Sequence, residues 1–269
     1  MLESVAETKG LTCEKKCNHV EKHHVLVRGE IMSLFKKVEV FGDSILKGIQ
    51  LGEDNRYHVD NNIEVDMLEE KFKLDIKNFS KFGCTLSKGF SRIERRLMGD
   101  KPKCDAIVMN FGGNDCDFNW SQVAERPDDE HMPNTPLDVF EEKYVKLINM
   151  IREKGIRPII TTLPPLDAQK FFNWFCGGLD KVNVVKWLCG VESIYRWQEN
   201  YSRTVEKIAE STGTPLVDLR GAFLKHRKLE PLLCEDGTHP NTAGQKIITQ
   251  GFLDFIEMAR ASGKIEIYA

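Results

Sequence analysis

The stretch Lys37-Val38-Glu39-Val40-Phe41-Gly42-Asp43-Ser44-Ile45-Leu46-Lys47-Gly48 decides the fold. Its first part predicts a short buried strand that stops at Gly42, because a glycine allows the backbone dihedrals of a sharp exit. The chain then enters a helix at Ser44, where the unpaired N–H groups of a helix start stabilise negative charge. A serine between a strand and a helix is more often an N-cap than a nucleophile. A catalytic role for Ser44 therefore requires partners elsewhere in the chain.

A histidine and an acid near the C-terminus meet this requirement. In Cys234-Glu235-Asp236-Gly237-Thr238-His239-Pro240-Asn241, the carboxylate of Asp236 stands three residues before His239 in a turn-rich segment. This spacing allows Asp236 to orient the imidazole, and the neutral ring can then take the proton of Ser44, as in a serine triad. A lone Asp-x-x-His is more often a surface turn, so the pair carries weight only because it occurs together with the serine.

Two further segments supply donors for a developing oxyanion. Val108-Met109-Asn110-Phe111-Gly112-Gly113-Asn114-Asp115 predicts an apolar strand that runs into two glycines and then the amide of Asn114. One such donor contributes about 3 to 4 kcal/mol to lowering a reaction barrier. In Phe82-Gly83-Cys84-Thr85, the N–H of Gly83 is open to close approach because glycine has no side chain.

These segments, taken together, resemble the four blocks of the SGNH, or GDSL-type, hydrolase family, in the family's order and over roughly residues 38–255. The matching residues are Gly42-Asp43-Ser44-Ile45, Gly83, Gly112-Gly113-Asn114-Asp115 and Asp236-Gly237-Thr238-His239. Ile45 stands where the family usually has leucine, which is a conservative apolar change. No G-x-S-x-G elbow surrounds Ser44, and this argues against the α/β-hydrolase fold.

The resemblance implies a role for each motif residue. Ser44 would be the nucleophile, and Asp236 and His239 would complete the triad. The N–H groups of Ser44 and Gly83 and the side chain of Asn114 would form the oxyanion hole. The activity implied is carboxylic ester hydrolysis, with no metal or organic cofactor. We consider Asp43, Asp115 and Trp120 further candidates for contact with the substrate.

Strand and helix patterns alternate along the rest of the chain. Strands are expected at 37–42, 74–79, 105–111, 157–163 and 216–219, and helices at 45–51, 67–73, 86–97, 135–154, 192–211 and 241–260. The polar stretch 116–134 is expected to be a surface loop. The alternation predicts an α/β fold, a three-layer α/β/α sandwich around a mostly parallel, flavodoxin-like sheet of about five strands.

Aromatic residues are concentrated in segment 167–201. They are Phe171, Phe172, Trp174, Phe175, Trp187, Tyr195 and Trp197. Packing between two helices explains such a set, because aromatic side chains dominate buried area wherever they occur. A lid over the acyl pocket or a contact between subunits is the alternative, since large exposed apolar patches usually serve binding.

Composition limits the partners and the location. The chain has 269 residues, of which 41% are hydrophobic, and this suffices for one large α/β domain. Its 38 basic and 41 acidic residues give a net charge of -3 without a dense basic run, so no nucleic-acid partner is expected. No stretch approaches the roughly 18 apolar residues of a membrane span, and the N-terminus lacks the apolar core of a signal peptide. We therefore expect a cytoplasmic protein; the sequence leaves the oligomeric state open.

Residues 1–31 predict an N-terminal extension, and residues 32–269 the hydrolase-like domain. The eight cysteines are dispersed through the chain, so reduced thiols are expected. The extension contains Cys13, Cys17, His19, His23 and His24, residue types that bind tetrahedral zinc. Their spacing matches no strong zinc pattern, and we expect no bound metal.

The leading hypothesis is a serine esterase that acts on small, water-soluble short-acyl or O-acetyl carbohydrate esters. Acyltransferases, lysophospholipases and thioesterases use the same triad, so they remain alternatives. A flavodoxin-like protein that binds a phosphate or flavin at helix N-termini without catalysis is a rival from another class. A second rival is an interaction module in which the Cys/His-rich extension binds zinc.

Overall fold

The computed structural model describes residues 35–59, 65–99 and 103–262. Its central sheet consists of β1 (Lys37–Gly42), β4 (Asp75–Asn78), β5 (Ala106–Asn110), β6 (Arg157–Thr161) and β7 (Leu216–Val217). The strand order is β4-β1-β5-β6-β7, and every neighbouring pair is parallel. This is the order of a flavodoxin-like doubly wound sheet, so the predicted fold class is confirmed.

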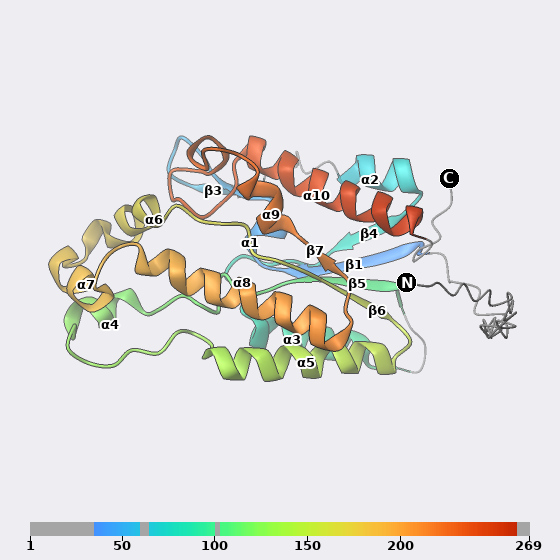
Figure 1. Ribbon diagram of the computed structural model, residues 1–269, viewed down its shortest axis with the longest axis horizontal. Helices are drawn as coiled ribbons and strands as arrows, with labels where there is room; N and C mark the ends of the chain where they lie inside the picture. Colours follow the sequence, from blue (N-terminus) through green and yellow to red (C-terminus); the bar gives the residue numbers. More distant parts are fainter. Residues whose placement is uncertain (1–34, 60–64, 100–102, 263–269) are drawn as a thin grey trace, which may run out of the picture. The chain divides into compact units, whose positions relative to one another are not determined.

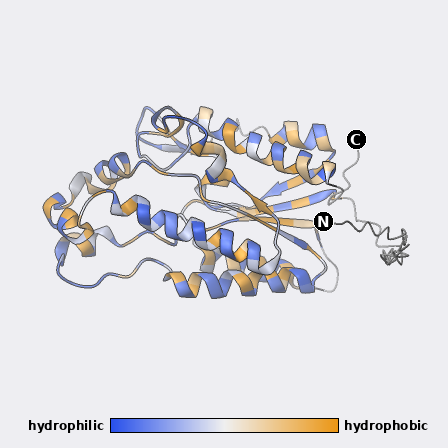
Figure 2. Cartoon of the chain, in the orientation of Figure 1, coloured by the Kyte–Doolittle hydropathy of each residue, from blue (hydrophilic) through white to orange (hydrophobic). Residues whose placement is uncertain are grey.

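Helices cover both faces of the sheet (Figure 1). One face carries α3 (Leu86–Leu97), α5 (Leu137–Glu153) and α8 (Ser193–Thr212), and the other carries α2 (Val65–Phe72), α9 (Leu219–Leu224) and α10 (Thr242–Ala261). Each face has its own hydrophobic core, because successive strand residues point to opposite faces. In Figure 2 orange dominates at the middle of the sheet, whereas the helices alternate between orange and blue, as amphipathic helices do.

The register of the strands aligns the motif segments at one edge of the sheet. All five residues of β5 are buried, as expected for a strand covered on both faces. Gly42 at the end of β1 is paired with Asn110 at the end of β5, so the segments that follow both strands leave the sheet side by side. Ligand sites of doubly wound proteins lie at this carboxyl edge.

The prediction of a helix at 45–51 is correct only for its first turn. Helix α1 (Ser44–Lys47) ends because Gly48 takes a left-handed conformation with φ of 76° and caps it. The chain continues as β2 (Ile49–Leu51), which forms an antiparallel hairpin with β3 (Tyr57–Val59). The hairpin turn includes Asn55 with φ of 58°, and asparagine is one of the residues that tolerate this conformation.

The predictions for two other segments also need correction. Segment 116–134 is not a continuous loop, because it contains α4 (Trp120–Glu125), whose first turn is capped by the side chain of Asn119. The last strand is shorter than predicted, because Asp218 ends it by accepting a hydrogen bond from the N–H of Gly221 as the N-cap of α9. A 3-10 turn, η2 (Glu230–Leu232), then leads towards the histidine loop.

The aromatic segment folds into α6 (Ala168–Phe175), the 3-10 turn η1 (Cys176–Gly178), α7 (Lys181–Leu188) and the beginning of α8. These elements pack with α4 around a third hydrophobic cluster, which includes Phe118, Val123, Phe172 and Val184. At least part of the aromatic segment is therefore core. Four other aromatic side chains of the segment, Phe171, Trp174, Phe175 and Trp197, line the cavity described below.

Some predictions lie outside the described residues. The boundary between residues 31 and 32 is one, and the cluster of Cys13, Cys17, His19, His23 and His24 is another. Within the described ranges, no helix is long and apolar enough to cross a membrane. The six cysteines among the described residues are free, namely Cys84, Cys104, Cys116, Cys176, Cys189 and Cys234.

Candidate active site

Ser44 is the first residue of α1, directly after the end of β1. The carboxylate of Asp43 caps this helix by accepting a hydrogen bond of 2.9 Å from the N–H of Ile45. The cap fixes the turn from strand to helix, and the side chain of Ser44 is held in a buried position with 6% of its surface exposed.

His239 lies in a tight loop between η2 and α10. The loop is closed by a hydrogen bond of 2.8 Å from the N–H of Cys234 to the carbonyl of His239. Asn241 then caps α10 through the N–H groups of Ala243 and Gly244. These contacts anchor the imidazole to the start of a 20-residue helix rather than leave it on a free loop.

The structure brings Ser44, His239 and Asp236 into one hydrogen-bonded chain. Nε2 of His239 lies 2.8 Å from Oγ of Ser44, and Nδ1 lies 2.6 Å from Oδ2 of Asp236. The other carboxylate oxygen, Oδ1, accepts hydrogen bonds of 3.0 Å from the N–H groups of Thr238 and His239. Asp236 itself is fully buried.

The surroundings of Asp236 favour its ionised form. Burial alone would raise the pKa of this carboxyl, but the hydrogen bonds and positive charge of His239 and the N–H of Thr238 lower the pKa below its ordinary value. An ionised Asp236 holds the proton of the neutral ring on Nδ1. The lone pair of Nε2 then faces the hydroxyl of Ser44.

The sequence predicts three oxyanion donors: the amide of Asn114, which lines the same cavity as Ser44, and the N–H groups of Ser44 and Gly83. The side-chain amide of Asn114 donates one hydrogen to Oδ2 of Asp43 at 3.1 Å, which leaves its second hydrogen available. Within the described ranges, the N–H groups of Ser44 and Gly83 have no recorded hydrogen-bond partner. Gly83 has a φ of +65°, a conformation that other residues adopt at a cost.

Asp43 and Asp115 are held inside the protein. Asp115 accepts hydrogen bonds from the N–H of Leu86 and the hydroxyl of Thr135, is fully buried, and does not line the catalytic cavity. Asp43 does line it, although only 2% of its surface is exposed. Burial raises the pKa of each carboxyl to about 6.

Aromatic side chains that sequence reasoning missed surround the histidine. The ring centroid of Tyr57, on β3, lies 5.1 Å from that of His239, and the ring of Phe82 stacks on His239 at 5.9 Å with an interplanar angle of 9°. Trp174 contacts Tyr57 edge-on at 6.3 Å. Phe82 adjoins Gly83 in the sequence and was identifiable from that position, whereas nothing in the sequence ties the hairpin residue Tyr57 to His239.

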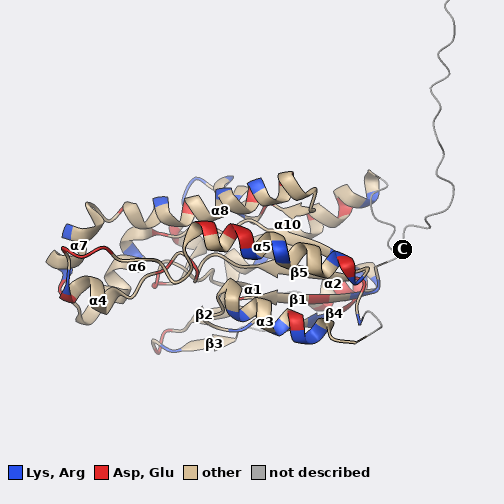
Figure 3. Cartoon of the chain, turned by 90° about the horizontal axis from the view of Figure 1, so that it is seen from below, with Lys and Arg blue, Asp and Glu red and all other residues tan. Residues whose placement is uncertain are grey.

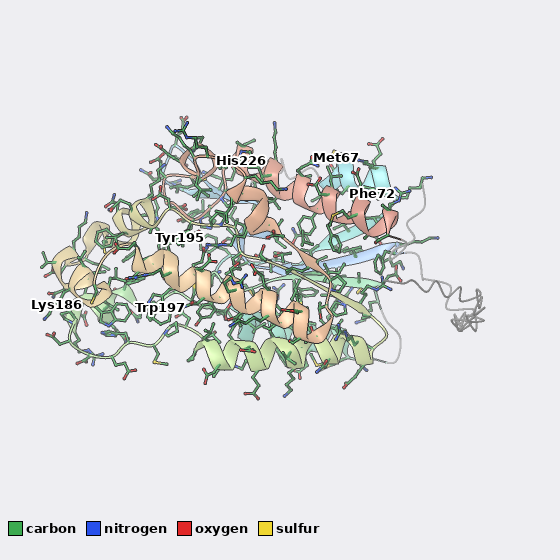
Figure 4. All side chains as sticks on the ribbon, viewed as in Figure 1. Met67, Phe72, Lys186, Tyr195, Trp197 and His226 are labelled. Carbon is green, nitrogen blue, oxygen red and sulfur yellow. The ribbon has the colours of Figure 1, made fainter. Side chains whose placement is uncertain are left out.

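A cavity of about 350 Å³ opens at Ser44 and His239, which is within the size range of small-molecule sites. Helices α4, α6 and α8 contribute aromatic side chains to its walls, namely Trp120, Phe171, Trp174, Phe175 and Trp197. Trp120, a predicted substrate contact, therefore lines this cavity. Figure 4 labels Trp197 on α8 at the end of the molecule where α4, α6 and α7 gather.

One carboxylate lies among these aromatic walls. Asp117 lines the cavity and accepts a hydrogen bond of 2.8 Å from the indole N–H of Trp120. Burial raises the pKa of Asp117 to about 6. His131, in the same segment, has its ring centroid 5.5 Å from that of Trp187 and does not line the cavity.

A smaller cavity of about 100 Å³ lies on the other side of the sheet, among apolar side chains such as Val40, Leu68 and Phe252. It contains none of the motif residues with reactive side chains. Among the described residues, the cavity at Ser44 is thus the one that combines a hydroxyl with an imidazole hydrogen-bonded to a carboxylate.

Comparison with known proteins gives a consistent result. The model of the GDSL-like Lipase/Acylhydrolase family matches residues 40–247. The uncharacterized lipoprotein YqeF of Bacillus subtilis is 22% identical over 230 residues, which cover 82% of this chain and 89% of that protein.

Solved structures share the fold. A lipase/acylhydrolase from Enterococcus faecalis is 18% identical with a TM-score of 0.59, and the match covers 87% of this chain and 100% of the other. A catalytic mutant of Axe2, an acetylxylan esterase from Geobacillus stearothermophilus, is 21% identical with a TM-score of 0.58. The match covers 83% of this chain and 95% of the other.

Proposed function

The chain belongs to the GDSL-like lipase/acylhydrolase family and is an esterase of the SGNH type, and we propose that Ser44, His239 and Asp236 are its catalytic triad. The observation that carries this proposal is the contact of 2.8 Å between Nε2 of His239 and Oγ of Ser44. The distance lies within the range expected for a nucleophile and its general base. Membership of the family makes the flavodoxin-like binding protein an inferior explanation of the same fold.

Acylation begins when Oγ of Ser44 attacks the ester carbonyl carbon. His239 takes the hydroxyl proton on Nε2, and Asp236 stabilises the imidazolium that forms. The tetrahedral intermediate then collapses, the bond to the alcohol oxygen breaks, and His239 returns the proton to that oxygen. Water then attacks the acyl-enzyme through the same steps, so that a carboxylic acid leaves and Ser44 is regenerated.

The negative charge of the intermediate would fall on the former carbonyl oxygen. We assign its stabilisation to the N–H groups of Ser44 and Gly83 and to the free hydrogen of the Asn114 amide. Asn114→Ala removes one of these donors, and we expect kcat to fall on the order of 10²-fold. Covalent labelling of Ser44 by a fluorophosphonate should continue at a lower rate, because the nucleophile and base are unchanged.

We propose short-acyl or O-acetyl carbohydrate esters as substrates. The broad aromatic side chains around the cavity suit packing against the apolar face of a sugar ring, and Asp117 offers an acceptor for its hydroxyl groups. The acetylxylan esterase among the structural neighbours is consistent with this choice. Lysophospholipase and thioesterase activities remain alternatives with the same triad.

A panel of acyl donors tests the substrate class. Hydrolysis of acetyl, butyryl and octanoyl esters of one alcohol should become slower as the acyl chain outgrows a small pocket, with each methylene worth about 0.8 kcal/mol. Equal rates across the three esters would contradict a small acyl pocket. Product analysis with an added alcohol acceptor separates hydrolysis from acyl transfer. The cytoplasmic location stays a prediction, and the lipoprotein relative gives it no support.

A further inference from the structure

A basic hollow of about 520 Å³ lies beside the candidate active site. Four cationic side chains line it: Lys81, Lys88, Arg92 and Arg95. Its wall also includes Phe82 and Gly83, and Phe82 lines the catalytic cavity as well. The hollow and the cavity therefore share a wall, and the loop that carries a proposed oxyanion donor separates them.

The positive charge of the hollow is not neutralised locally. Among the described residues that line it, none is acidic, and none of the four cations takes part in a recorded ion pair. Lys88, Arg92 and Arg95 follow the i, i+4, i+7 spacing that places side chains on one face of α3. In Figure 3, α3 carries blue basic segments beside a red acidic one. Because the whole chain has a net charge of -3, this concentration is a local feature.

Several donors in the hollow remain available to a ligand. Lys88 donates to the carbonyl of Gly83 at 3.1 Å and keeps two ammonium hydrogens. Nε of Arg95 donates to the carbonyl of Ser91 within its own helix, which leaves the terminal nitrogens. Arg92 donates through Nη2 to the carbonyl of Phe79 and also interacts with the side chain of Cys84. The free hydrogens of Lys88 and Arg95 are therefore the donors that an anion in the hollow can use.

We propose that this hollow binds an anionic group carried by the ester substrate, a carboxylate, sulfate or phosphate. The inference rests on the proposed esterase function and names the substrate class of the same site. The shared wall at Phe82 and the contact of Lys88 with the Gly83 carbonyl place the hollow next to the cavity that contains Ser44. Clustered cations attract an anion and orient it through charge-assisted hydrogen bonds. The substrate is thus an ester whose charged group lies outside the aromatic cavity.

Three matched aryl acetates test the proposal, namely phenyl acetate, 3-acetoxybenzoate and (3-acetoxyphenyl)trimethylammonium. They present the same ester with a net charge of zero, minus one or plus one. We expect kcat/KM to be highest for the anionic ester and lowest for the cationic one. The preference should weaken as salt screens the attraction. A preference for the cationic ester would overturn the proposal and would indicate control by Asp117 in the aromatic cavity.

Variants separate this effect from the intrinsic reactivity of each ester. In Lys81→Gln/Arg95→Gln, we expect the ratio of kcat/KM for 3-acetoxybenzoate to that for phenyl acetate to fall about tenfold, since such a factor corresponds to two charge-assisted contacts. The control is Lys207→Gln/Lys246→Gln, which removes the same charge from exposed positions on α8 and α10. The ratio of the two kcat/KM values in this control should equal that of the wild type. A wild-type ratio in the Lys81/Arg95 variant would overturn the proposal.

A binding measurement distinguishes failure of this inference from failure of the proposed function. Calorimetric titration of Ser44→Ala with 3-acetoxybenzoate should show tighter binding than titration of Ser44→Ala/Lys81→Gln/Arg95→Gln. If the wild type hydrolyses none of the three esters, the proposed function fails, and the titration alone decides the anion site. Equal affinities in the two proteins would overturn the anion site, whatever the outcome of the hydrolysis assays.

Discussion

The side-chain amide of Asn114 donates a hydrogen bond to the carboxylate of Asp43, with 3.1 Å between Nδ2 and Oδ2. The same carboxylate caps α1 through its other oxygen, Oδ1, and so positions the N–H of Ser44 as well. One buried side chain thus holds two of the proposed oxyanion donors. This gives the aspartate of the Gly-Asp-Ser motif a positioning role distinct from contact with the substrate.

Asp43→Asn isolates that role. The amide oxygen of an asparagine keeps the cap on α1, but its NH₂ group would face the NH₂ group of Asn114 and break their contact. We expect kcat to fall about tenfold to a hundredfold, because a donor loses its orientation towards the oxyanion. KM should change less, since the contact matters mainly in the transition state.

Steady-state kinetics and thermal unfolding of this variant provide the measurement. Asp180→Asn is the matched control, because Asp180 caps α7 through Val182 and Asn183 away from Ser44. Both variants should unfold at nearly the wild-type temperature. An unchanged kcat in Asp43→Asn would show that Asn114 does not depend on Asp43.

Asp236→Asn should leave the fold intact and lower kcat on the order of 10³- to 10⁴-fold. An amide can donate to Nδ1 of His239, which places the imidazole proton on Nε2, where it faces Ser44 and prevents general-base action. Stopped assays with a sensitive acetyl ester can measure the remaining rate. A loss smaller than about tenfold would mean that Asp236 does not set the tautomer of His239.

Asp115 predicts a pH dependence of stability. Its pKa is raised from 3.8 to about 6 in the folded state, so the folded protein binds the proton more tightly than the unfolded chain does. The stabilisation of the folded state by this proton is fully present below the pKa of Asp115 in the unfolded chain. It is lost as pH rises through the pKa in the folded state. Since the pKa is raised by about two, the free energy of unfolding should fall by at most about 3 kcal/mol between pH 4 and pH 7.

Urea unfolding of the wild type and Asp115→Asn at several pH values measures this effect. Asparagine does not titrate, so the free energy of unfolding of the variant relative to the wild type should increase as pH rises from 4 to 7. A constant difference across this range would contradict the raised pKa. The lost hydrogen bonds to Leu86 and Thr135 shift the difference by a constant and do not change its slope.

Phe82 should affect turnover through the ring that it stacks on His239. Phe82→Ala removes the stack and exposes the imidazole to water, and we expect kcat to fall about threefold to tenfold, since aromatic pairs contribute about 0.5 to 1.5 kcal/mol beyond their buried area. Phe82→Tyr keeps the ring and should remain near the wild-type rate. Stability should change little, because 55% of the Phe82 surface is exposed. Equal kcat values for the two variants would argue against a role of the stack.

The sequence predicted those parts of the molecule that depend on local periodicity. The helix at 86–97 agrees with α3, and the buried apolar run before Gly112 is β5. The motif residues were predictable because each follows a strand or precedes a helix, and parallel strands deliver their carboxyl ends to one edge. Ser44 follows β1 at this edge, and the loop before α10 brings His239 to it although 195 positions separate them.

The rest depends on contacts that no local pattern encodes. Gly48 ended α1 early, and the short hairpin that followed brought Tyr57 to His239 through tertiary packing. Asp43 and Asp115 looked suited to substrate contact, but the charge and hydrogen-bond capacity that suggested this are used inside the protein, by α1, Asn114, Leu86 and Thr135. The four cations of the basic hollow come from a loop and one helical face, and their proximity to the cavity appears only in three dimensions.

Intact-protein mass spectrometry after reaction with a fluorophosphonate tests the central claim most directly, that Ser44 is a nucleophile activated by His239. The wild type should gain one covalent adduct, with peptide mapping placing it on Ser44, and Ser44→Ala should gain none and lose ester hydrolysis by several orders of magnitude. An adduct on another residue, or a Ser44→Ala protein that hydrolyses esters at the wild-type rate, would contradict it.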